Sequence, residues 1–235
     1  MTAPAVAIES LAFAYPDGTR ALDGLELRVA AGERVALLGA NGAGKSTLLL
    51  HLNGILACSP SVSILGMTVE KCNLREIRRR VGLVFQNPDD QLFCPTVFDD
   101  VAFGPRNLGL AESDVRARVA DALDAVGLPN AGERTSFHLS VGQKKRVALA
   151  SVLAMGCEVL VLDEPTSALD PRGRRELMAL LEGIGRTQLI ATHDLDFVAR
   201  LCGRAVVMAR GRVVADGTPE RILGDHGLLE AHGLA

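Results

Sequence analysis

Two groups of residues in this sequence have the types and spacing that phosphate chemistry requires. The first runs from Gly39 to Thr47 and fits the P-loop pattern G-x-x-x-x-G-K-[ST] at every fixed position. Its glycines allow backbone N–H groups to converge on phosphate oxygens, while Lys45 can reach the β- and γ-phosphates and the Ser46 hydroxyl can ligate Mg²⁺. The run therefore predicts a nucleoside triphosphate site. Its predicted nucleotide-binding residues are Gly39, Ala40, Asn41, Gly42, Ala43, Gly44, Lys45, Ser46 and Thr47.

The second group is a pair of carboxylates that follows the apolar run Val159–Leu162. Ligands of parallel sheets bind at the carboxyl ends of the strands, which is where Asp163 and Glu164 are expected to lie. We interpret Asp163 as a support for Mg²⁺ and Glu164 as the general base that polarises the attacking water. An ordinary acidic turn after a strand is the alternative, and the P-loop upstream disfavours it.

The remaining sequence predicts the elements that position these two groups. Apolar residues 34–38 predict a buried strand before the glycine loop, and residues 48–52 predict the first turns of a helix after it. Further strands are predicted at 6–15, 25–29, 62–64, 81–85, 159–162, 188–191 and 205–208, and helices at 140–155, 171–184, 194–201 and from Thr218-Pro219 onward.

These elements predict an α/β fold built as one domain over residues 1–235. Residues 1–86 and 156–235 are expected to form a P-loop NTPase core, a mostly parallel sheet with flanking helices and an N-terminal antiparallel β subdomain. Residues from about 87 to 155 read as an inserted helical subdomain, since Val115, Val119 and Leu123 recur at helical spacing.

Composition narrows the possible functions. The chain has 235 residues, of which 48% are hydrophobic, so a large core is expected. A net charge of −3, one tyrosine and no tryptophan argue against nucleic-acid binding. No basic, apolar N-terminal segment and no long apolar run are seen, so we expect a soluble, cytosolic protein that can still bind a membrane protein. The five cysteines lack CxxC spacing and are expected to be small buried residues rather than zinc or disulfide partners.

A third motif is specific to one family. The residues Leu-Ser-Val-Gly-Gln at 139–143 resemble the LSGGQ signature of ABC transporter ATP-binding subunits, with Val141 in place of the first glycine. Lys144-Lys145-Arg146 follows, and Asp163 comes further along the chain in the family's order. The resemblance implies the ABC ATPase fold and a head-to-tail dimer, in which Ser140, Gly142 and Gln143 contact the ATP of the opposite subunit. Val141 is compatible with this role if its side chain points away from the nucleotide.

Other residues match the family in order and take their roles from the resemblance. Tyr15 is expected to stack on adenine, with a packed strand tyrosine as the alternative, and Asp170 belongs to the D-loop Ser167–Asp170. Gln86 matches the Q-loop glutamine, and His193 matches the switch histidine. The predicted catalytic residues are thus Lys45, Gln86, Glu164 and His193, and the predicted Mg²⁺ ligands, partly through water, are Ser46, Gln86 and Asp163.

The residues around and after Gln86 resemble one group within the ABC transporter family. Residues 84–93, 95–97 and 100–105 resemble the ATPases of energy-coupling factor (ECF) transporters, which take up vitamins or cobalt and nickel ions. The resemblance implies a transmembrane coupling subunit and a substrate-binding membrane subunit as partners, with Leu92 and Phe93 as apolar anchors for the former. Some members carry an extra C-terminal dimerisation region, which we do not expect here.

The sequence thus predicts an ATPase, with ATP and Mg²⁺ as cofactors, that powers an ECF importer for cobalt or nickel at the cytoplasmic face of the membrane. It would act as a homodimer, or as a heterodimer with a related ATPase. Import of a vitamin such as biotin, or another ABC importer, is the main alternative. A soluble ABC protein of DNA repair or translation is disfavoured by the single P-loop and the lack of heptads, and a small-metabolite kinase by the signature motif.

Overall fold

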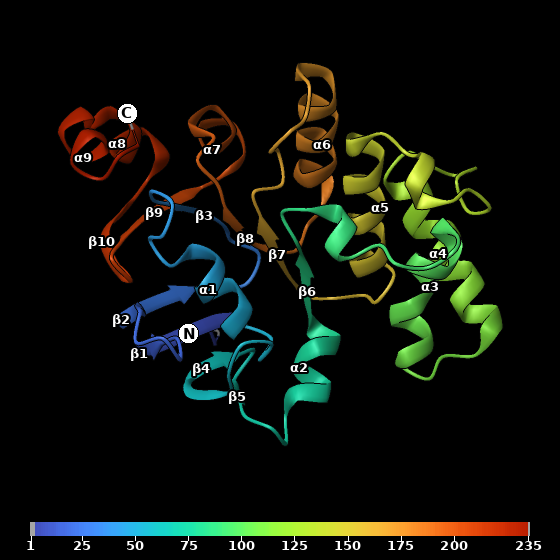
Figure 1. Cartoon of the computed structure of the whole chain (residues 1–235), viewed down its shortest axis with the longest axis horizontal. Coiled ribbons are helices and arrows are strands. Elements are labelled where there is room, and N and C mark those ends of the chain that lie inside the picture. The colour runs from blue at the N-terminus through green and yellow to red at the C-terminus, as the bar shows by residue number, and fades with distance from the viewer. Residues whose placement is uncertain (1–2, 235) are drawn as a thin grey trace.

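The computed structural model describes residues 3–234, and within them a six-stranded sheet forms the centre of the molecule (Figure 1). Its strand order is β10-β9-β3-β8-β7-β6; all neighbours are parallel except the β9–β10 hairpin. The strands are β3 (Arg34–Leu38), β6 (Val81–Val84), β7 (Val159–Asp163), β8 (Thr187–Ala191), β9 (Arg204–Ala209) and β10 (Arg212–Gly217).

The central strand β3 explains why the sequence shows continuous rather than alternating apolar runs. Ala36 and Leu38 pack into the apolar core on one side of the sheet, and Val35 and Leu37 pack into the core on the other side. Parallel strands covered on both faces need apolar residues at every position. The parallel register also aligns Asp163 of β7 with Ala191 of β8, so the loops after β3, β7 and β8 leave the same edge of the sheet.

A smaller antiparallel sheet covers one side of this core, with the order β2-β1-β4-β5. Its strands are β1 (Val6–Ala14), β2 (Arg20–Val29), β4 (Ser59–Ile64) and β5 (Met67–Val69). It shares its apolar core with helices α1 (Lys45–His51) and α2 (Leu74–Arg80). The predicted antiparallel β subdomain is therefore present, and β5 is a strand that the sequence patterns did not reveal.

Helices α3 (Val97–Asn107), α4 (Glu112–Ala125) and α5 (Val141–Leu153) pack against one another beside β6 and β7, at the right of Figure 1. Val115, Val119 and Leu123 are buried on one face of α4, as their spacing predicted. The remaining helices are α6 (Pro171–Gly183), α7 (Leu195–Leu201), α8 (Pro219–Gly224) and the unpredicted α9 (His226–Ala231). The predicted fold class is confirmed.

Some local expectations are wrong. Cys58 and Cys72 are exposed, whereas only Cys157 and Cys202 are fully buried as predicted for all five. Leu92 is 4% exposed and belongs to the apolar core, so it is not a surface anchor. Within residues 3–234, no helix combines the length and the apolar character that crossing a membrane requires.

Candidate active site

The carboxyl edge of the large sheet holds a cavity of about 320 Å³, formed where β3, β6, β7 and β8 end. The structure brings together there most of the predicted phosphate loop, Gln86, both carboxylates and His193. The lining residues are Asn41, Gly42, Ala43, Gly44, Lys45, Ser46, Thr47, Gln86, Asp163, Glu164 and His193. We call this the phosphate-loop cavity.

The loop between β3 and α1 requires glycine for two different reasons. Gly44 has a φ of 101°, and a Cβ atom there would lie 2.5 Å from the carbonyl oxygen of Ala21, so no other residue fits without displacing backbone. The loop is also fastened from outside, because the Gly211 N–H donates to the Ala43 carbonyl at 3.0 Å. The phosphate-binding conformation is therefore built into the fold.

Lys45 begins α1 and is buried beneath the loop. Its Nζ donates to the Gly39 carbonyl at 2.6 Å and to the Ala40 carbonyl at 3.3 Å. Burial lowers the pKa of Lys45 from its ordinary value, and the charges of Glu164 and Asp163 partly offset this. Among residues 3–234 the ammonium group donates hydrogen bonds to carbonyl oxygens alone, so it can exchange them for phosphate oxygens, which carry more negative charge.

Asp163 ends β7 and lies against the loop. Burial raises its pKa, while a hydrogen bond from the Ser46 side chain works in the opposite direction. A carboxylate and a hydroxyl on facing elements are hard oxygen ligands of the kind that Mg²⁺ takes beside phosphates. Ser46 and Asp163 therefore fit a magnesium ion that also touches a bound triphosphate.

Glu164 is the most unusual residue of the cavity. Its φ is 43°, in the left-handed region that non-glycine residues rarely occupy. Its side chain is 10% exposed, and His193 Nδ1 lies 2.9 Å from Oε2. That approach lacks hydrogen-bond geometry, so within residues 3–234 Oε2 is a buried acceptor without a donor. A buried carboxylate oxygen left unpaired is costly, which marks it as an acceptor for a proton of a bound group.

Gln86 follows β6 and is exposed, with its side chain in the cavity lining. Gln91, to which the sequence assigned no role of its own, holds the loop behind Gln86: Oε1 accepts from the Phe85 N–H at 3.1 Å, and Nε2 donates to the Ala148 carbonyl at 2.9 Å. Gln91 thus ties the segment after β6 to α5. No local pattern points to it, because its partners on α5 lie far along the chain.

Tyr15 lies next to the loop helix but not in the cavity lining. Its hydroxyl is 3.0 Å from Thr47 Oγ1, and its ring meets Phe13 edge to face, with centroids 5.1 Å apart. The ring is half-buried, and its stacking on adenine stays a prediction, with a packed strand tyrosine as the alternative.

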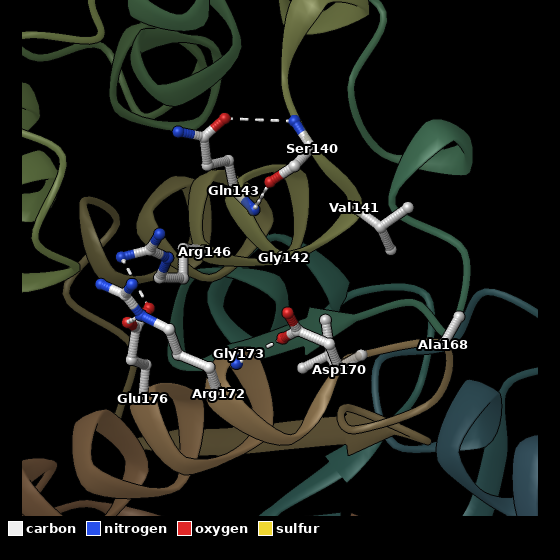
Figure 2. Close-up of a pocket in the computed structure, with 11 residues that line it drawn as sticks. Ser140, Val141, Gly142, Gln143, Arg146, Ala168, Asp170, Arg172, Gly173 and Glu176 are labelled. Carbon is white, nitrogen blue, oxygen red and sulfur yellow. Dashed lines mark hydrogen bonds and ion pairs between the residues drawn. The ribbon is translucent and has the colours of Figure 1, made fainter.

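The predicted signature residues form a second cavity, of about 360 Å³, between the N-termini of α5 and α6 (Figure 2). Ser140 Oγ accepts from the Gln143 N–H at 3.3 Å, and Gln143 Oε1 accepts from the Ser140 N–H at 3.1 Å. This reciprocal capping box starts α5. Asp170 Oδ1 similarly accepts from the Gly173 N–H at 2.7 Å and starts α6. We call this the signature cavity.

Two helix N-termini converging on one hollow favour a bound anion. Val141 is 45% exposed, and its side chain lies off to one side of Ser140 in Figure 2. The phosphate-loop cavity and the signature cavity share no lining residue. Among residues 3–234, Ser140, Gly142, Gln143 and Asp170 thus line a different cavity from that of the phosphate loop of the same chain.

The glycine loop, the paired acidic residues and the fold define an ATP-binding cassette, and comparisons with known proteins agree. The family described as "ABC transporter" matches residues 22–167, and the chain belongs to it. It is an ABC ATPase, which binds ATP and couples its hydrolysis to transport.

Among its relatives, the energy-coupling factor transporter ATP-binding protein EcfA of Carboxydothermus hydrogenoformans is 51% identical over 234 residues, covering 98% of this chain and 86% of that protein. The solved structure of cbiO1 from Clostridium perfringens, described as part of the ABC transporter complex cbiONQ, is 40% identical with a TM-score of 0.85, covering 99% of this chain and 95% of its own. A dimeric cassette in a post-hydrolysis state, bound to ADP and Pi, is 26% identical with a TM-score of 0.81, covering 91% of this chain and 98% of its own.

Proposed function

We propose that this chain is the ATPase subunit of an energy-coupling factor importer and that the importer carries cobalt or nickel ions. The gathering of Lys45, Asp163, Glu164 and His193 in one cavity carries the ATPase part of the proposal. The assignment to an ECF importer is supported by relatives of that name, which are 51% identical in sequence over nearly the whole chain. The metal cargo rests on the resemblance to metal-importing members of the ECF group, and a vitamin importer is the alternative.

In the proposed reaction, the loop N–H groups and Lys45 bind the β- and γ-phosphates. Ser46 and Asp163 would hold Mg²⁺, with Gln86 as a further ligand through water, and the ion would supply positive charge that stabilises the phosphates. Glu164 Oε2, the unpaired buried acceptor, takes the proton of the attacking water as its oxygen bonds to the γ-phosphorus and the bond to ADP breaks. His193 has an exposed side chain beside Glu164, and it would contact the γ-phosphate.

The separation of the two cavities supports a dimer. Each ATP would be bound by the phosphate loop of one subunit and covered by Ser140 and Gly142 of the other, which is the closed C₂ arrangement expected of two identical chains. The second subunit of the dimer could instead be a related ATPase with the same signature motif. The post-hydrolysis relative is dimeric, which supports this reading.

The helical segment after Gln86 is the proposed contact for a transmembrane coupling subunit, at the cytoplasmic face of the membrane. Phe93 is 63% exposed, and its ring meets that of the exposed Phe103 edge to face with centroids 5.0 Å apart. This aromatic pair replaces the predicted Leu92–Phe93 pair as the apolar anchor. Residues 87–155 would then move against the core formed by residues 1–86 and 156–235 when ATP closes the dimer.

The proposal is tested by reconstituting the chain into proteoliposomes with the membrane subunits of an ECF importer from the same organism. We expect ATP-dependent uptake of radioactive cobalt or nickel, which the Glu164→Gln variant abolishes. Uptake of biotin in place of the metals would keep the ECF assignment and overturn the cargo. ATP hydrolysis that no membrane subunit stimulates would overturn the importer assignment.

A further inference from the structure

Lys145 is a buried lysine that the proposed chemistry does not use. It lies in the first turns of α5 and is 4% exposed. Lysine is almost never fully buried without a partner. Within residues 3–234, its ammonium group has no ion pair; Nζ instead donates to the Glu164 carbonyl at 3.0 Å and to Ser167 Oγ at 3.0 Å.

The Glu164 carbonyl accepts an unusual number of hydrogen bonds. Besides Lys145 Nζ, the Ser167 N–H donates to it at 3.1 Å and the Ser167 hydroxyl donates to it at 2.9 Å. A carbonyl oxygen has two lone pairs, so three donors, one of them charged, saturate it. The main chain of Glu164 is therefore held more firmly than an ordinary loop residue.

This hold matters because Glu164 is in a strained backbone conformation. Its φ of 43° is unfavourable for any residue with a Cβ. Strained conformations persist only where the surroundings over-determine them. Lys145 and Ser167 supply that restraint, on the residue whose carboxylate is the proposed base.

We propose that Lys145 is a positioning residue that fixes the main chain of Glu164 and so links the N-terminus of α5 to the hydrolytic carboxylate of the same subunit. The inference rests on the proposed function. Ser140 caps α5 and faces the ATP of the second subunit, whereas Glu164 acts on the ATP of its own subunit. A shift of α5 when the signature engages one ATP moves Lys145 Nζ, and with it Glu164, at the other ATP.

The test compares Lys145→Met, which keeps the length of the side chain but removes every donor, with Lys145→Gln, which restores an N–H donor. Lys71→Met is the matched control, because Lys71 is exposed and outside both cavities. The readouts are kcat and KM for ATP–Mg²⁺ hydrolysis by the full chain in complex with its membrane subunits, and the affinity for a fluorescent ATP analogue.

We expect Lys145→Met to lower kcat by roughly tenfold or more, since small misplacements of a catalytic group are that costly, while KM and analogue affinity change little. Lys145→Gln should recover most of the loss, and Lys71→Met should match the wild type. Equal kcat for Lys145→Met and Lys71→Met would overturn the inference. A wild type that does not hydrolyse ATP would instead overturn the proposed function.

Ser167→Ala provides an independent test should Lys145→Met fail to fold. It removes the second side-chain donor on the same carbonyl, so we expect it to lower kcat severalfold without weakening nucleotide affinity. Where Lys145→Met does fold, its combination with Ser167→Ala should be less than additive, because both act on one group. Unchanged kcat for Ser167→Ala, or a fully additive pair, would contradict a shared role in positioning Glu164.

Discussion

The phosphate-loop cavity and the signature cavity differ in how their polar groups are satisfied. In the first, as far as the described part of the chain goes, Lys45 donates hydrogen bonds only to carbonyl oxygens and Glu164 Oε2 accepts no hydrogen bond. In the second, Ser140 and Gln143 satisfy each other, and Asp170 bonds to the Gly173 N–H. Polar groups without a full set of hydrogen-bond partners can bind a ligand, whereas polar groups that bond to one another fix the shape of the surface. We therefore expect substitutions in the first cavity to remove chemistry, and substitutions in the second to change how two subunits meet.

The largest effect should come from Lys45→Ala. The loop N–H groups alone cannot neutralise the β- and γ-phosphates, so ATP affinity should fall by a factor on the order of 10² or more, and hydrolysis with it. Titration with a fluorescent ATP analogue measures the loss, and Lys71→Ala is the control of equal charge. Retained affinity would mean that the cavity binds phosphate through its backbone alone.

Glu164→Gln should separate chemistry from binding. The amide keeps the shape of the side chain but cannot accept the proton of the attacking water, so kcat should fall by a factor on the order of 10² or more while ATP affinity stays. Phosphate release by the purified variant checks this. Hydrolysis at the wild-type rate would remove Glu164 from the base role.

Ser140→Arg, made in the Glu164→Gln background, tests the second cavity. ATP–Mg²⁺ should hold the Glu164→Gln chain as a dimer, and a bulky arginine at the N-terminus of α5 should disperse it while each subunit still binds ATP. Light scattering with and without nucleotide gives the result. A dimer that survives Ser140→Arg would mean that the signature does not face the nucleotide.

If Glu164→Gln alone stays monomeric with saturating ATP, a related but different ATPase becomes the better partner.

Ser140→Ala is a milder control for the same position. It should cost about 1 kcal/mol of stability through the lost cap of α5, without the steric block.

The smallest expected effect is a dependence of folding stability on pH through His51, in the helix that follows the phosphate loop. His51 is buried in α1, with Nδ1 2.7 Å from the Thr47 carbonyl, and burial lowers its pKa from the ordinary value. Below about pH 6.5 the unfolded chain takes up a proton that the folded chain resists, so stability falls as pH falls, with a limit of about 1.4 kcal/mol per pH unit.

Denaturant unfolding of the wild type and of His51→Gln at about pH 7.5 and pH 5.5 measures this slope. The variant lacks the titrating ring, so its stability should decline less on acidification. Equal slopes for the two proteins would show that His51 does not contribute.

Features that depend on neighbouring residues were predictable from the sequence. The glycine loop, the apolar strands and the cap at Ser140 involve contacts within a few residues, so their local patterns predicted them. The order of the motifs was enough to predict the fold class, because apolar strands alternating with helices lead to a mostly parallel sheet. The parallel sheet then brings Asp163 and Glu164 to the edge that holds the P-loop.

Only the tertiary structure decided which side chains are buried and what they contact. Leu92 and Phe93 are adjacent and both apolar, yet one is in the core and the other on the surface. Lys144 and Lys145 are likewise adjacent and of the same type, but Lys144 forms an ion pair with Asp89, whereas Lys145 donates to the Glu164 carbonyl. The reason is physical: the partners of these residues come from distant segments, and the direction in which a helix or loop faces is set by packing that no local pattern records.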